Sequence, residues 1–135
     1  MRTENKWGNQ VVLAAVLLTG FGAAHLIDDF LYGVPADFGL SNPVTQVLAL
    51  LYFLITSWLL VLAVRGQKAG YIGNMVLGLF LLTADMLKHG MEGMFWGPWR
   101  TGTFSRFLAF GVMGISLWLV VVSYKAWQAM KSDSP

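Results

Sequence analysis

Two apolar stretches of the chain carry ionisable side chains at the same helical spacing. The stretch HLIDDFLYG, residues 25–33, contains His25, Asp28, Asp29 and Tyr32. The stretch DMLKHGMEG, residues 85–93, contains Asp85, Lys88, His89 and Glu92. Within each set the residues are three, four and seven positions from the first, which places the set on one face of a helix. Because imidazoles and carboxylates exchange protons and bind metal ions, these two faces are the candidate functional site.

The two sets also match each other position by position at an offset of about sixty residues. The aligned pairs are His25 with Asp85, Asp28 with Lys88, Asp29 with His89 and Gly33 with Gly93. This pattern is expected of two helical hairpins in parallel orientation, the internal symmetry of many transporters. It predicts that both faces lie near the same ends of their helices and meet there.

Three kinds of chemistry fit these side chains. Chains of carboxylates and histidines relay protons or bind ions in membrane transporters. The same groups could hold a divalent Zn, Mn or Fe ion, through ligands chosen from His25, Asp28, Asp29, Asp85, His89 and Glu92. Lys88 would oppose a bound metal unless its ammonium pointed away. His25 and His89, the chain's two histidines, could instead ligate a b-type haem if they face each other at similar depth.

A structural role is the remaining alternative. Lys88 can act as the charge partner of Asp28, Asp29 or Asp85, so that the polar residues only hold helices together. The chain would then be a membrane-anchor subunit of a larger complex. The sequence contains no nucleotide-binding loop, nucleophile elbow or zincin motif, so it identifies no enzymatic reaction.

The composition places these residues in a membrane protein. Hydrophobic residues make up 56% of the chain, charged residues only 12%, and the mean hydropathy is +0.61, whereas soluble domains carry about 25% charged residues. The absence of cysteine excludes disulfides, Cys-ligated zinc and thiol catalysis. The nine Lys and Arg residues are scattered at segment ends, which argues against a nucleic-acid partner.

Four apolar segments can position the two faces. They cover residues 11–32, 44–64, 71–91 and 104–124, each about the 20 residues that cross a bilayer as a helix. Helix is required because backbone groups in hydrocarbon must be hydrogen-bonded within the segment. We therefore predict an all-α, polytopic membrane protein, a bundle of four transmembrane helices that forms a single domain over residues 1–135.

The positive charges predict the orientation of the bundle. They precede the first helix, fill the loop after the second and follow the fourth, at Arg2, Lys6, Arg65, Lys68, Lys125 and Lys131. The positive-inside rule places these regions, and both termini, in the cytoplasm, and the polar site at the opposite face of the cell membrane. Because four helices are few for a transport path, and the second carries no charge, we expect a homo-oligomer or a subunit of a membrane complex.

A cleavable signal peptide is the competing interpretation of residues 1–24. They have a basic start, a short apolar core and small residues before His25. The apolar character resumes with LIDDFLY, however, which gives the segment the length of a membrane span.

Overall fold

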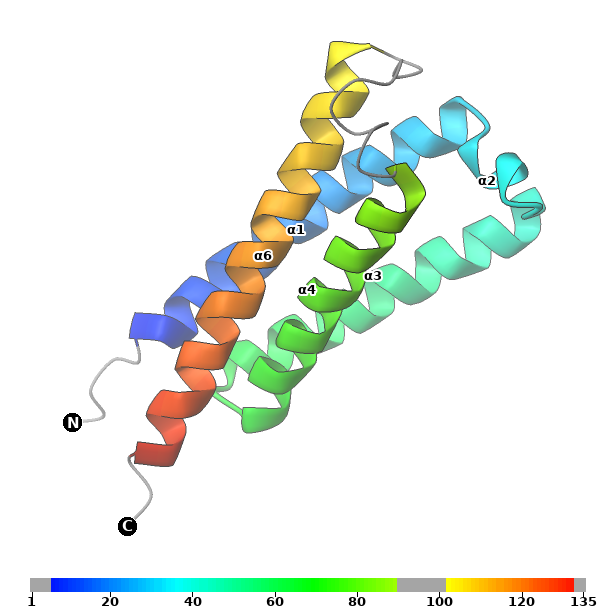
Figure 1. Cartoon of the computed structure of the whole chain (residues 1–135). Coiled ribbons are helices and arrows are strands. Elements are labelled where there is room, and N and C mark those ends of the chain that lie inside the picture. Colours follow the sequence, from blue (N-terminus) through cyan, green and yellow to red (C-terminus); the bar gives the residue numbers. More distant parts are fainter. Residues whose placement is uncertain (1–5, 90–101, 133–135) are drawn as a thin grey trace.

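The computed structural model describes residues 6–89 and 102–132 of the chain (Figure 1). The described residues form helices and turns without strands. The helices are α1 (Lys6–Leu31), α2 (Val34–Asp37), α3 (Asn42–Val64), α4 (Lys68–His89) and α6 (Thr103–Ser132). All but α2 are long and apolar enough to cross a membrane, so the predicted all-α bundle of four transmembrane helices is confirmed, and the chain fits a multi-pass membrane protein.

Helix α6 is the centre of the bundle, because it packs along both α1 and α4. Buried apolar side chains of α1 and α6 form most of the core, which includes Val11, Leu18, Leu119 and Val122. Helix α3 packs against α4 and α1 and is the most exposed of the four. Only 17% of its most apolar window is buried, against 44% for α6, so most of α3 is exposed on the surface of the bundle.

Two helices extend beyond the predicted spans. Helix α1 begins at Lys6 rather than at residue 11, and α6 continues to Ser132 rather than ending near residue 124. Contacts between these extensions account for the difference. The Lys125 ammonium lies 4.4 Å from the centre of the Trp7 ring, and Ala126 is completely buried. Because these turns pack against each other, they stay helical after the apolar sequence ends.

The connection between α1 and α3 is more ordered than the loop that the sequence predicts. Gly33 ends the first helix with a left-handed φ of 70°, the short helix α2 follows, and Gly39 turns the chain again with φ 69°. Ser41 is the N-cap of α3 and Pro43 occupies its first turn, although the Ser41 side chain makes no capping hydrogen bond.

The turn between α3 and α4 is tight and rests on two glycines. Gly66 has φ 65°, a conformation that other residues rarely adopt, and the Gln67 amide donates back to the Leu62 carbonyl. Gly70 packs so closely on α3 that a Cβ there would overlap the backbone of Leu62 and Ala63. This turn lies at the same end of the bundle as the two termini (Figure 1). The polar stretches therefore lie at the opposite end.

The close approach at Gly70 predicts a measurable cost of substitution. Gly70→Ala should lower the free energy of unfolding in detergent by about 1–3 kcal/mol, because the new methyl group meets rigid backbone rather than a movable side chain. The matched control is Gly20→Ala in α1, where a Cβ would meet nothing within 4 Å. That variant should keep or slightly raise stability, since alanine favours helix. Equal stability of the two variants would contradict the packing.

Candidate functional site

Helix α1 supplies one side of the polar cluster. His25 and Asp28 are buried, 7% and 8% exposed, and Asp29 is partly buried. Their spacing keeps them on the inner face of α1, as the sequence predicts. Tyr32 does not share their burial, because α1 ends at Leu31 and the Tyr32 side chain is 48% exposed.

Helix α4 supplies the opposite side. Asp85 is buried, and its Oδ1 lies 3.7 Å from His25 Nε2. The Lys88 ammonium lies 2.5 Å from Asp29 Oδ2 and 3.5 Å from His25 Nε2. His25 Nε2 is itself 3.8 Å from the same Asp29 oxygen. One carboxylate oxygen of α1 is thus close to both an ammonium and an imidazole, and Lys88 pairs with Asp29 rather than with Asp28.

Helix α6 adds a residue that the sequence reasoning missed. The Ser105 hydroxyl donates a hydrogen bond to Asp28 Oδ2, and both side chains are buried. Asp28 is therefore held by a helix remote in sequence. The sequence did contain an indication that Ser105 faces the interior, because its spacing places it on the same helical face as Ser116 and Ser123.

Helix α3 contributes Tyr52, which the sequence also did not single out. Its hydroxyl donates to the Leu18 carbonyl of α1 at 3.3 Å, and its ring lies where a side chain at position 22 would be. Because position 22 is glycine, α1 and α3 can approach each other here. The Tyr52 ring therefore borders the cluster on the side of α3.

Two predicted site residues cannot be placed in the cluster. His89 is the last residue of α4, but its side chain lies outside the described part of the structure, and Glu92 falls within residues 90–101, also outside it. A haem held by His25 and His89 therefore stays a prediction. The surroundings of His25 Nε2, where Asp29, Asp85 and Lys88 converge, are charged rather than the apolar pocket that a porphyrin requires.

Part of the predicted metal-ligand set does come together. His25, Asp28 and Asp29 each offer a ligand atom, and these atoms lie within 4.8 Å of one another. The Lys88 ammonium points into this group rather than away from it. A divalent ion would have to displace it, because an ammonium and a metal ion repel each other at such distances. Lys88 thus already provides a positive charge to the cluster.

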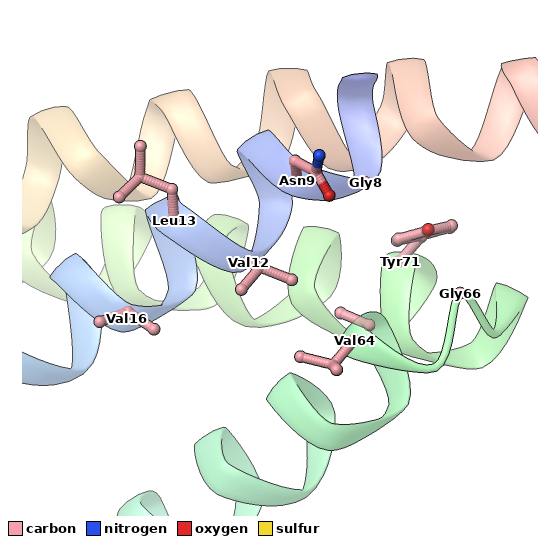
Figure 2. A pocket seen from close by; sticks show the side chains of 9 residues that line it. Gly8, Asn9, Val12, Leu13, Val16, Val64, Gly66 and Tyr71 are labelled. Atoms are coloured by element: carbon pink, nitrogen blue, oxygen red, sulfur yellow. The ribbon is translucent and has the colours of Figure 1, made fainter. Parts of the chain in front are cut away.

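A cavity lies at the end of the bundle opposite the His25 cluster (Figure 2). It has a volume of about 550 Å³ and lies between the start of α1 and the α3–α4 turn. Figure 2 shows Val12 and Val64 on facing helices at its apolar wall and Tyr71 on α4 beside the Gly66 turn. Asn9 is its other polar side chain. Val16, the lining residue nearest the cluster along α1, precedes His25 by nine residues, about 14 Å of helix.

Comparison with known proteins gives no relative to draw on, since no family model, curated protein or solved structure matches the chain.

The Lys88–Asp29 pair predicts an asymmetry between single and double substitutions. Lys88→Met should destabilise the protein by about 1–3 kcal/mol, because it leaves a partly buried carboxylate without its charge partner. The double variant Lys88→Met with Asp29→Asn should regain much of that loss, since no unpaired charge remains. Detergent unfolding followed by circular dichroism measures both.

The control for this comparison is Asp37→Asn on α2, where the side chain is exposed. It should change stability little. If Lys88→Met were as stable as this control, the ion pair would not hold α1 to α4.

Proposed function

We propose that the chain is a proton- or ion-handling membrane protein, and that His25 is the group that gains and loses the proton. The observation that carries the proposal is the position of His25 Nε2, within 4 Å of Asp29, Asp85 and Lys88. An imidazole can change its charge near neutral pH. Among three charged neighbours in a buried site, that change alters which contacts are favourable.

The balance of charge supports this assignment. Apart from the exposed Asp37 of α2, the described part of the site end holds three carboxylates, Asp28, Asp29 and Asp85, against the cations Lys88 and Arg106. Arg106 follows Ser105 on α6 and is partly buried. One negative charge is thus in excess when His25 is neutral, and protonation of His25 balances it. Since uncompensated charge is costly in low dielectric, the cluster favours binding one proton or one small cation.

The contacts suggest how proton binding could be coupled to movement. Neutral His25 accepts a hydrogen bond from the Lys88 ammonium, whereas a protonated His25 repels that ammonium and attracts Asp29 and Asp85. The two cations then compete for the same oxygen, Asp29 Oδ2. Loss of the Lys88 contact would loosen the link between α1 and α4 at this end. A second ion or a small solute could enter there, which is how a proton gradient would drive transport.

Proton flux tests the proposal directly. Proteoliposomes that contain a pH-sensitive dye should acidify when a potassium diffusion potential is imposed. His25→Ala should lower the initial rate by about tenfold or more, the factor that corresponds to a barrier raised by about 1.4 kcal/mol. Asp37→Asn, a carboxylate change on the exposed helix α2, should leave the rate unchanged. A wild-type rate equal to that of protein-free liposomes, or full activity of His25→Ala, would contradict the proposal.

Metal binding is the second candidate, favoured by the convergence of His25, Asp28 and Asp29. The same purified samples distinguish it from proton handling. Stoichiometric Zn, Mn or Fe that is lost in His25→Ala, together with the absence of proton flux, would favour a metal site.

We further propose that the cluster faces the extracytoplasmic side and that both termini are cytoplasmic. The exposed positive residues Lys6, Arg65, Lys68, Lys125 and Lys131 all lie at the terminal end of the bundle, and such residues are retained on the cytoplasmic side. A homo-oligomer that forms through the exposed face of α3 would also fit this proposal, because four helices alone enclose a transport path poorly.

Single cysteines test this orientation without background, because the chain contains none. A cysteine at Asn42 should react in intact cells with an impermeant thiol reagent, while one at Gln67 should react only after lysis. The reverse labelling pattern would contradict the proposed orientation, because it would place both termini on the extracytoplasmic side.

A further inference from the structure

The inner faces of α4 and α6 carry polar residues toward both of their ends. On α4 these are Tyr71, Asn74, Asp85 and Lys88, and on α6 they are Ser105, Ser116 and Ser123. Separations of three, seven and eleven residues keep each set on one helical face. Asn74, Ser116 and Ser123 are 1% exposed or less. Polar side chains of membrane-spanning helices usually face the bundle interior, where they find hydrogen-bond partners or line water-filled cavities.

The two rows face each other. Gly78 of α4 packs against α6 so closely that a Cβ there would lie 2.8 Å from the Ser116 carbonyl oxygen. Measured along α4 from Gly78, Asn74 lies about 6 Å nearer the terminal end, where α1 starts and α6 finishes. Asp85 lies about 10 Å from Gly78 in the other direction, toward the His25 cluster. Because α6 runs in the opposite direction, Ser123 lies on the Asn74 side and Ser105 on the Asp85 side. The rows therefore have polar members at both ends of the bundle, with the apolar side chains of Leu81 and Val112 on the same faces between them.

Four atoms in these rows are buried without a hydrogen-bond partner among the residues that the structure describes. They are Asn74 Oδ1, Ser116 Oγ, Ser123 Oγ and Asp85 Oδ2. Three threonines in the same bundle, Thr19, Thr45 and Thr83, donate to the carbonyl four residues earlier. Ser116 and Ser123 do not take this common arrangement. Buried polar atoms that lack a protein partner are usually bonded to internal water.

The row begins at the cavity of Figure 2. Tyr71 lines that cavity, and Asn74 is the next inner-face residue of α4. The Asn74 amide nitrogen donates to the Leu59 carbonyl at 3.2 Å and to the Gly70 carbonyl at 2.8 Å. These two bonds fix the orientation of the side chain, so its Oδ1 is left as an acceptor for water in the core.

We propose that Asn74 Oδ1, Ser116 Oγ and Ser123 Oγ hold a file of water molecules that extends from the cavity at the terminal end toward the His25 cluster. This inference rests on the proposed function, since it supplies the second access that a proton site needs. A proton from cavity water would pass along the file, each water accepting one proton and donating another. Leu81 and Val112 pack between the inner end of the file and Asp85, so the last transfer, to Asp85, requires these side chains to move. From Asp85 the proton would reach His25 Nε2, which lies 3.7 Å from Asp85 Oδ1. It would leave to water beside Asp29 and Lys88, which are partly exposed.

Reaction of buried thiols with silver ions tests the hydration of this route. Because the chain has no cysteine, Ser116→Cys and Ser123→Cys each create a single thiol of nearly the same shape as the serine. In the folded protein both should lose their free thiol on exposure to silver ions, since the ion needs water to reach them. The free thiol that remains is measured with a maleimide after unfolding.

Ala126→Cys is the matched control. Ala126 is also completely buried on α6, but it lies in the apolar core and nearer the end of the helix than Ser123. Its thiol should stay protected until the protein unfolds, so reaction at Ser123→Cys could not be attributed to fraying of the helix end. If both serine positions were as protected as Ala126→Cys, the core would be dry and the inference would be overturned. If only one serine variant folds, that variant decides.

The silver experiment does not depend on proton flux, so the two proposals can fail separately. Reactive thiols together with no wild-type flux would keep the water file and overturn its use by protons. With flux present, Ser116→Val should lower it as His25→Ala does, because the valine removes the hydroxyl and fills its space. Normal flux in a folded Ser116→Val variant would place the proton route elsewhere.

Discussion

The sharing of one carboxylate oxygen by an ammonium and an imidazole is the interaction on which the site depends. Asp29 Oδ2 belongs to α1, and Lys88, which pairs with it, belongs to α4. The contact joins two helices that otherwise pack against each other very little. In a medium of low dielectric such a pair is strong only while its charges balance. In the proposed function, the protonation state of His25 and the separation of α1 from α4 are therefore linked.

Helix α6 is the second element on which this proposal depends. It packs along both α1 and α4 and therefore holds the bundle together when their direct contact changes. Its Ser105 fixes Asp28, while Asp29, one residue later, is left to Lys88. Two adjacent carboxylates of one helix thus have different partners. Asp28 is part of a static contact to α6, and Asp29 takes part in the contact that a proton can alter.

The transmembrane spans and the convergence of His25, Asp85 and Lys88 could be predicted from sequence, because apolar length and helical spacing depend only on local geometry. The choice of Asp29 over Asp28 as the partner of Lys88 could not. It depends on the rotation of α1 relative to α4, which is set by packing against α6. Ser105 and Tyr52 were missed for the same reason, since each reaches the cluster from a helix that carries no matching pattern. Tyr32 lies just past the last residue of α1 and is 48% exposed, which helical spacing alone does not indicate.

The long sequence separation of the partners has a consequence for how the protein enters the membrane. Lys88 follows Asp29 by 59 residues, and Ser105 follows Asp28 by 77. Since chains are synthesised from the N-terminus, α1 and α3 emerge while neither partner exists. The first hairpin must then keep both carboxylates protonated or at the lipid–water interface. Only the arrival of α4 and α6 allows them to be buried as charged groups, so the depth of α1 in the bilayer is settled by the second half of the chain.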